Sequence, residues 1–196
     1  MLCPILLASC ALGPKFGPEG NPKQPGTYAH FKAQPDYPKT SAHWVNSVLL
    51  DQTSPANSRV VVSLKQQRGF LMMGDQVVID YPICSGTSAR PTPKGEYRIM
   101  EKVVEKSSNR YGRIYDAEGK CVNSDADAFT DPIPEGGKFV GAPMNYWMRL
   151  THDGVGHHIG PVLRRPASHA CVRGPSKVIP IVFGKVKIGT EVVIGD

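Results

Sequence analysis

The stretch from Gly154 to Arg173 reads GVGHHIGPVLRRPASHACVR and gathers three histidines and one cysteine. An imidazole near a thiol either removes its proton or, as imidazolium, stabilises the thiolate, so this combination is typical of nucleophilic catalysis. If the end of the stretch is extended, His169 and Cys171 project to the same face, because side chains alternate along a strand. The stretch alone leaves three interpretations open for Cys171: a nucleophile, a buried structural cysteine, or a zinc ligand together with His157, His158 and His169.

The end of this stretch resembles the sequence motif of a known family. Residues 168–173, SHACVR, are similar to the SHGCxR motif of the L,D-transpeptidase catalytic domain, also called YkuD-like. His158 lies ten positions before Ser168 (168 − 158 = 10), in a GxHxG context similar to the family's upstream histidine segment. Further matches are Ser85-Gly86, the turn Thr92-Pro93-Lys94-Gly95 and the aromatic strand Tyr146 to Leu150. The resemblance runs from about Arg59 to the carboxyl terminus.

Local patterns predict a mainly β domain. Residues 60–64 form a β-branched run, and residues 70–72 and 76–84 are typical of two strands joined at Gly74-Asp75 in a hairpin. Further strands are predicted at residues 97–104, 146–150 and 186–194, and a short helix interrupted by Pro180 at residues 176–183. With the resemblance, these patterns predict a single L,D-transpeptidase-like β-sandwich with one or two short helices.

A long polar segment interrupts the predicted strands. Residues 107–143 are rich in Gly and Pro, and we expect a lid-like loop over the site, since long loops in compact domains are often functional. Asp125, Asp127 and Asp131 lie in this segment, but their spacing does not fit a calcium-binding loop. No metal site is predicted here.

The chain is expected to divide into three parts. Residues 1–10 are a predicted lipoprotein signal segment, because Leu7-Ala8-Ser9-Cys10 resembles a lipobox in which Cys10 would carry the lipid. A frayed apolar terminus is the alternative, because no Lys or Arg precedes the apolar residues. The many prolines of residues 11–57 predict an extended tether, in which residues 43–50 form one short turn that docks on the domain. Residues 58–196 are the predicted catalytic domain.

Charge and cysteine content narrow the possible partners. The formal net charge is +6, and between Arg149 and Lys187 the only acidic residue is Asp153, so this segment would attract an anionic ligand. Nucleic acid is not predicted, because no basic helix, aromatic RNA-binding pattern or zinc-finger spacing accompanies the charge. The five cysteines form no CxxC pair, which argues against a closed zinc site, and a Cys84–Cys121 disulfide is one possibility.

The resemblance implies a role for each matching residue. Cys171 would be the nucleophile, His158 its base or ion-pair partner, and His169 the second imidazole beside the thiol. The carbonyl of Ile159 would orient His158, and the backbone amides near Ala170 and Cys171 would form an oxyanion hole. The residues expected to bind substrate are Arg173, Ser168, Tyr146 and Trp147. For Arg173, holding the catalytic loop is the alternative. His157 occupies a position that is usually apolar in similar sequences and is expected to be a partly exposed or packed ring, and His152 a surface residue.

The resemblance also implies a function. It predicts an L,D-transpeptidase in the bacterial cell envelope outside the cytoplasm (periplasm), anchored by a lipid, that acts on peptidoglycan peptide stems through a thioester and needs no cofactor. The acceptor would be an amine of a second stem or of a protein, or water. Ala170 departs from the family's glycine, and a positive φ there would cost an alanine of order 1 kcal/mol. A catalytically impaired peptidoglycan-binding module is therefore the alternative.

Overall fold

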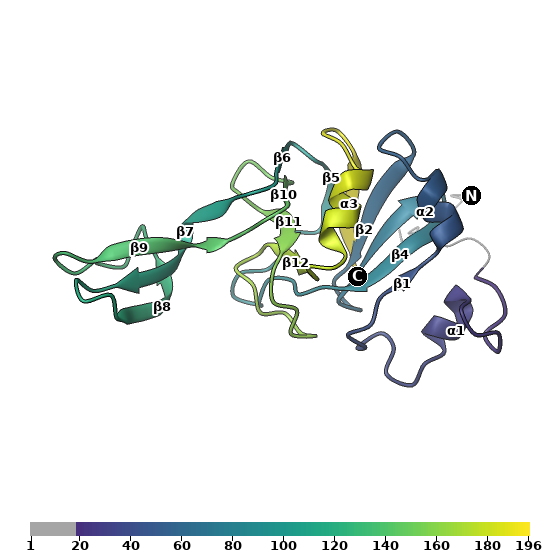
Figure 1. The fold of residues 1–196 in the computed structure, drawn as a ribbon, viewed down its shortest axis with the longest axis horizontal. Helices are drawn as coiled ribbons and strands as arrows, with labels where there is room; N and C mark the ends of the chain where they lie inside the picture. Colours follow the sequence, from purple (N-terminus) through teal and green to yellow (C-terminus); the bar gives the residue numbers. More distant parts are fainter. Residues whose placement is uncertain (1–18) are drawn as a thin grey trace, which may run out of the picture.

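The computed structural model describes residues 19–196. The predicted signal segment and the lipidation of Cys10 lie outside this range, as do the first residues of the predicted tether. The described chain is mainly β, as predicted, with three sheets and three short helices (Figure 1). None of these helices has the length and apolar character needed to cross a bilayer.

A six-stranded sheet forms the body of the domain. The predicted hairpin at Gly74-Asp75 is present, with Gly74 at a φ of 56°. The strand at residues 191–195 pairs in parallel with the strand at residues 58–63. On its other side it pairs antiparallel with the strand at residues 95–98, which follows the TPKG turn and forms one edge of the sheet. In sheet order the strands are β1 (Trp44–Val45), β4 (Gln76–Pro82), β3 (Arg68–Met73), β2 (Ser58–Ser63), β13 (Glu191–Gly195) and β5 (Gly95–Arg98).

Both faces of this sheet are covered. Val60 and Val62 belong to the larger core cluster, which includes helix α3 (Ile179–Lys185), whereas Val61 belongs to a second cluster on the opposite face. This division follows from the alternation of side chains along a strand. Pro180 lies in the first turn of α3, where proline is tolerated, so it does not interrupt the helix as the sequence suggested.

The amino-terminal segment supplies the cover for the second face, and here the structure differs from the expected extended tether. Residues 19–57 include helix α1 (Tyr28–Lys32), strand β1 and helix α2 (Ser47–Gln52). The buried Tyr28 donates a hydrogen bond of 2.9 Å to Asp80, which also forms a fully buried ion pair of 2.7 Å with Arg68. The aromatic residues between the prolines bury apolar surface on the sheet, which outweighs the tendency of a proline-rich segment to stay extended.

A smaller sheet carries the residues of the histidine and cysteine stretch. It has four strands in the order β12 (Val172–Gly174), β11 (Gly156–Ile159), β10 (Trp147–Arg149) and β6 (Glu101–Val103). The strand predicted at residues 97–104 is therefore divided, because β5 and β6 belong to different sheets. Residues of β10 and β12 pack into the larger core cluster with α3, which holds the two sheets together.

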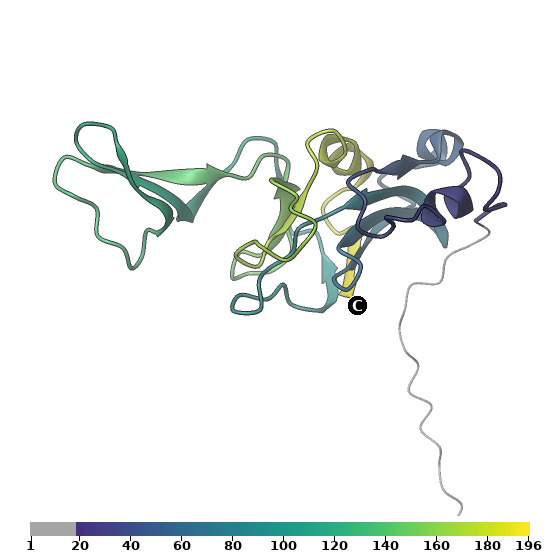
Figure 2. The same ribbon diagram turned by 90° about the horizontal axis from the view of Figure 1, so that it is seen from below.

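The segment predicted as a long loop is instead a three-stranded arm. Strands β7 (Ser107–Tyr115), β8 (Cys121–Asp127) and β9 (Lys138–Pro143) pair in the order β8-β7-β9 and project away from the body (Figure 2). Cys121 is exposed on this arm, while Cys84 is buried in the body, and both are free thiols. The possible disulfide between them is therefore not formed, since the arm and the body separate the two sulfurs.

Candidate active site

Strands β11 and β12 bring the upstream histidine and the cysteine together. They pair in parallel, with His157 opposite Val172 and His158 opposite Arg173. Cys171 directly precedes β12, so continuation of this register puts it beside Gly156. Side chains alternate along the strands, so Cys171, Arg173 and His158 share one face. The sequence brings the thiol and this imidazole together through strand pairing, across twelve intervening residues.

The ring of His158 is held by its own strand. It is buried, with an exposed fraction of 4%, and its Nδ1 lies 2.7 Å from the carbonyl oxygen of Ile159. This is the contact that the family resemblance implies. Because a carbonyl oxygen accepts, Nδ1 carries the proton and the lone pair of the neutral ring lies on Nε2. The His158 ring is therefore in the tautomer required of a proton acceptor.

The charge states of the two groups are set mainly by burial. Burial lowers the pKa of His158 to about 4 and raises the pKa of the Cys171 thiol above its ordinary value. The main chain of Gly156 and the charge of Arg173 oppose the shift at Cys171 but are the smaller effects. Near neutral pH the His158 imidazole and the Cys171 thiol are therefore both neutral, which are the charge states that a general-base arrangement needs.

The thiol itself is partly exposed, and its contacts are with the main chain. Its sulfur lies 3.8 Å from the carbonyl oxygen of Gly154, and no hydrogen bond to an imidazole is present in residues 19–196. The N–H groups of Ala170 and Cys171 likewise have no partner within this part of the chain. Two unpaired amides at the thiol are the groups that an oxyanion hole needs.

The loop before Cys171 is bent, and Ala170 is the point of bending. Its φ is 87°, in the region that favours glycine, so the extended conformation expected for residues 168–171 is wrong. Thr92 holds the bend from the TPKG turn: its hydroxyl donates a hydrogen bond of 2.6 Å to the carbonyl of Ala170. The hydroxyl oxygen of Thr92 in turn accepts a hydrogen bond of 2.8 Å from the Gly86 amide. A side chain at Gly86 would lie 2.1 Å from the carbonyl of Arg90, so this close approach requires glycine.

Ser168 has a structural position, which corrects its predicted role in substrate binding. Its exposed fraction is 2%, and its hydroxyl donates a short hydrogen bond to the carbonyl of Cys171. The main-chain amides of Ala167 and Ser168 both donate to the carbonyl of Ser85. A buried hydroxyl that closes the loop on itself cannot reach a substrate, because no surface is left to contact it.

His169 points towards the arm. Its ring stacks on Tyr111 of β7, with 4.3 Å between centroids and 7° between planes, and its Nε2 lies 3.4 Å from Asp125 of β8. Burial lowers the pKa of His169, while the charge of Asp125 acts in the opposite direction. Among the described residues the contacts of this imidazole are therefore with the arm, and the expected placement beside the thiol is not seen.

The two aromatic residues predicted to bind substrate lie in the interior or against it. Trp147 is 1% exposed, and its Nε1 donates a hydrogen bond of 2.8 Å to Glu101, so its assignment to the substrate surface is wrong. It packs against His158 on the neighbouring strand β11, with 5.9 Å between the two ring centroids. Tyr146 is half-buried and packs edge-on against Phe183 of α3. Trp147 thus contacts β11, whereas Tyr146 contacts α3.

His157 is the packed ring that the sequence analysis expected. Its Nδ1 lies 2.8 Å from the carbonyl of Val172 and its Nε2 3.0 Å from the hydroxyl of Tyr81. Full burial lowers the pKa of His157 to about 4, so the ring is neutral and its two nitrogens differ in role. His157 therefore ties the first residue of β12 to the core of the larger sheet.

Comparison with known proteins identifies the family of the chain. A family model described as the L,D-transpeptidase catalytic domain, YkuD, matches residues 57–194. The chain belongs to this family. A search of the curated proteins found no match to the sequence.

Solved L,D-transpeptidases share the fold. One from Mycobacterium smegmatis has a TM-score of 0.54 at 18% identity, over 70% of this chain and 58% of that one. L,D-transpeptidase 3 from Mycobacterium tuberculosis, in complex with a faropenem-derived adduct, has a TM-score of 0.52 at 19% identity, over 71% and 60%. One from Enterococcus faecium has a TM-score of 0.50 at 23% identity, over 70% and 49%. The matched part of this L,D-transpeptidase domain spans less than two thirds of each of these proteins.

Several residues of the L,D-transpeptidase site were not identified from sequence. Tyr111 and Asp125 contact His169 from a segment that showed no strand pattern. Gln67 lies far from every motif, yet its amide accepts from the Ser85 N–H at 3.1 Å and donates to the Ser85 hydroxyl at 2.7 Å. The resemblance to the SG and TPKG motifs located Gly86 and Thr92, but gave them no role.

Proposed function

We propose that this domain is a cysteine-dependent L,D-transpeptidase acting on the tetrapeptide stems of peptidoglycan. The observation that carries the proposal is the shared face of Cys171 and His158 on paired strands, with Nδ1 of His158 engaged by Ile159 and Nε2 left as the base. Family membership supports a transpeptidase-type chemistry. A thiol activated by a neutral imidazole is a general-base arrangement.

The reaction follows from these positions. The sulfur of Cys171 attacks the carbonyl of the third, diamino-acid residue of the stem while His158 Nε2 takes the thiol proton. The carbon–nitrogen bond to the terminal D-alanine then breaks, and the same proton passes to the departing amine. The thioester passes to an acceptor: an amine of a second stem gives a 3→3 cross-link, an amine of a protein anchors that protein, and water gives an L,D-carboxypeptidase. The free amides of Ala170 and Cys171 would stabilise the oxyanion.

Arg173 is the residue best placed to bind a stem carboxylate. Its main chain bridges Cys84, with two hydrogen bonds of 2.9 Å, so the backbone of this residue already holds the strand. Its side chain extends over Gly160, and no ion pair engages its guanidinium within residues 19–196. A guanidinium presents planar donors that match a carboxylate. Raising the salt concentration is therefore expected to raise the KM for the stem.

The decisive experiment compares the wild type with Cys171→Ala on purified disaccharide-tetrapeptide, followed by mass spectrometry of the intact protein and of the products. We expect a thioester mass on the wild type, release of D-alanine, and neither with Cys171→Ala. A carbapenem provides a second acylating probe of the same sulfur. Binding of the stem without any adduct on Cys171 would contradict the proposal and favour a catalytically impaired wall-binding module.

The cellular setting is part of the proposal. A domain that modifies peptidoglycan stems works outside the cytoplasm, and lipidation of Cys10 would hold it at a membrane. Labelling with a fatty-acid analogue in cells is expected to mark the wild type and not Cys10→Ala. Label that persists on Cys10→Ala would refute the anchor and leave the chemistry at Cys171 untouched.

A further inference from the structure

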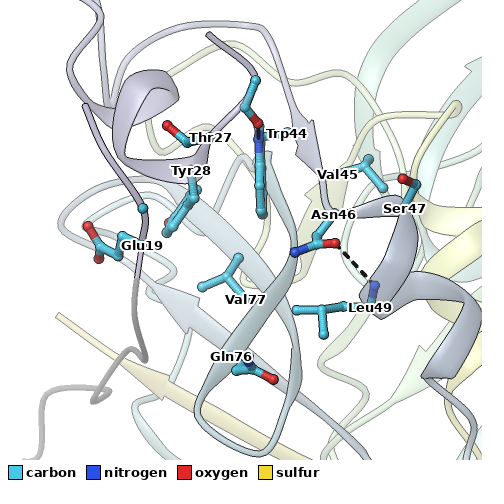
Figure 3. Close-up of a pocket in the computed structure, with 12 residues that line it drawn as sticks. Glu19, Thr27, Tyr28, Trp44, Val45, Asn46, Ser47, Leu49, Gln76 and Val77 are labelled. Carbon is cyan, nitrogen blue, oxygen red and sulfur yellow. Dashed lines mark hydrogen bonds between the residues drawn. The ribbon is translucent and has the colours of Figure 1, made fainter. Parts of the chain in front are cut away.

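A second candidate site lies away from the catalytic strands. A cavity of about 360 Å³ opens between the amino-terminal segment and the edge of the six-stranded sheet, and α1, β1, the start of α2 and the start of β4 form its walls (Figure 3). No residue of the loop 168–171 lines it. Its volume lies in the range of pockets that hold small organic ligands. The amino-terminal segment therefore creates a concave surface as well as covering the sheet.

One wall of this cavity is a rigid aromatic platform. The Nε1 of Trp44 donates a hydrogen bond of 2.9 Å to the carbonyl of Gly26, and the indole packs on Tyr28 with 4.8 Å between centroids. In Figure 3 the indole stands between Tyr28 and Asn46. Trp44 is half-buried, so part of the ring remains open to a ligand. A held indole presents apolar area without losing conformational freedom on binding.

The polar groups of the cavity that keep free donors or acceptors include two neutral amides and a hydroxyl. The Oδ1 of Asn46 accepts a hydrogen bond of 3.1 Å from the amide of Leu49, which leaves its Nδ2 to donate elsewhere. The side chains of Gln76 and Ser47 are exposed and make no hydrogen bond to residues 19–196. Such groups can both donate to and accept from a ligand's hydroxyls and amides.

The charge of the cavity argues against an ionic ligand. Among the described residues that line it, Glu19 is the one charged residue, and its carboxylate pairs with Lys32 at 2.7 Å. A phosphate or carboxylate ligand would find no cation among the wall residues of the range 19–196, and the paired carboxylate is a weak attractant for an amine. A ligand with an apolar face and neutral hydrogen-bonding edges fits best.

We propose that this cavity binds a sugar ring that carries an acetamido group, as in a chain of N-acetylhexosamines. The C–H face of such a ring would stack on Trp44, while its hydroxyl and acetamido groups would exchange hydrogen bonds with Asn46, Ser47 and Gln76. The biological identity of the ligand, the glycan strand of peptidoglycan, rests on the proposed function. The cavity would then hold the sugar strand of the polymer whose peptide stems react at Cys171.

The test is binding of an N-acetylglucosamine tetramer to the Cys171→Ala protein, followed by NMR of the Trp44 indole N–H. We expect this signal to shift at millimolar tetramer, Trp44→Leu to weaken binding at least about tenfold, and Gln76→Ala to weaken it by a smaller factor. Gln52→Ala, an exposed glutamine on α2 outside the cavity, is the matched control and should bind as before. A glucose tetramer, which lacks acetamido groups, should bind more weakly.

Two results would overturn the sugar site: no shift of the Trp44 signal at saturating tetramer, or unchanged affinity in both cavity variants. If Trp44→Leu loses its fold, as judged by its Tm, Gln76→Ala alone decides, because that side chain is exposed and makes no hydrogen bond to residues 19–196. Acylation of the otherwise wild-type cavity variants by a sugar-free tetrapeptide should be unchanged. Failure of tetramer binding with intact acylation refutes the cavity alone, and the reverse refutes the transpeptidase proposal alone.

Discussion

The hydroxyl of Thr92 and the carbonyl of Ala170 are joined by a hydrogen bond of 2.6 Å, which couples the TPKG turn to the bend before Cys171. The same Thr92 hydroxyl accepts a hydrogen bond from the Gly86 amide, so one side chain holds two loops. The family motifs that lie far apart in the chain are therefore one structural unit next to Cys171.

Removing this hydroxyl is expected to loosen the loop. Thr92→Val keeps the side-chain shape and leaves the Gly86 amide and the Ala170 carbonyl without their partner, which costs about 1–3 kcal/mol. We expect a lower Tm and slower acylation of Cys171 by a carbapenem, measured by stopped-flow and mass spectrometry. Thr92→Ser restores the donor and should return the rate close to that of the wild type. A fast Thr92→Val enzyme would show that the hydrogen bond does not position the loop.

Ala170→Gly is expected to stabilise the domain. The φ of 87° is strained for alanine and free for glycine, so relief of about 1 kcal/mol should outweigh the added flexibility of the unfolded chain. Acylation should be as fast as in the wild type or faster. Ala167→Gly is the matched control in the same loop, where φ is not positive, and should destabilise instead. Urea unfolding of the two variants checks the sign.

The pH dependence of acylation distinguishes a general base from an ion pair. The pKa of His158 is lowered to about 4 and that of Cys171 is raised, so the reactive pair of neutral groups persists from about pH 4 to above the ordinary thiol pKa. We expect kcat/KM to rise with pH through an acid limb near pH 4 and to stay level through neutrality. An imidazolium–thiolate pair would instead lose activity as the imidazolium deprotonates near neutral pH, and an alkaline limb there would contradict the assignment.

The arm should control the order of the catalytic loop through His169. Tyr111→Leu removes the stack at 4.3 Å and is expected to increase hydrogen exchange in residues 168–171 and to slow acylation several-fold. Tyr115→Leu, on the same strand beyond the contact, is the control. Equal exchange in both variants would mean that the arm does not hold the loop. Asp125→Asn should have a smaller effect, because Asp125 is largely exposed and its pairing with His169 is screened.

His157 should make the fold sensitive to acid. Its ordinary pKa of 6.5 applies in the unfolded chain, and burial lowers it to about 4 in the folded one. Between these values the unfolded state binds more protons, so stability falls as the pH falls from about 6.5 to about 4, by on the order of 3 kcal/mol for this ring. His157→Gln should remove part of that dependence in denaturant unfolding at a series of pH values. His152→Gln, at an exposed position, should not.

Much of the fold could be predicted because the strands of the body carry strong local patterns. The valines of β2, the hairpin at Gly74 and the aromatic start of β10 each have a period or turn residue that indicates a strand. The arm does not, because Ile114 and Ala126 are its buried apolar residues, while other apolar side chains such as Val122 and Val140 are exposed, so its strands show no regular apolar alternation. The sequence predicts a tether for the amino-terminal segment because its prolines favour an extended chain. The residues of the sheet that its aromatic side chains contact cannot be read from the segment itself.

The sequence by itself determined the family, the candidate nucleophile Cys171 and the candidate base His158. The motif SHACVR and the upstream GHHIG contain these residues in the order that the family motifs have. The tertiary structure decided which side chains meet. Parallel pairing of β11 with β12 puts His158 on the face of Cys171, and the bend at Ala170 turns His169 to the arm. Pairing between strands and the φ of a single residue depend on long-range packing, which no local pattern in the chain encodes.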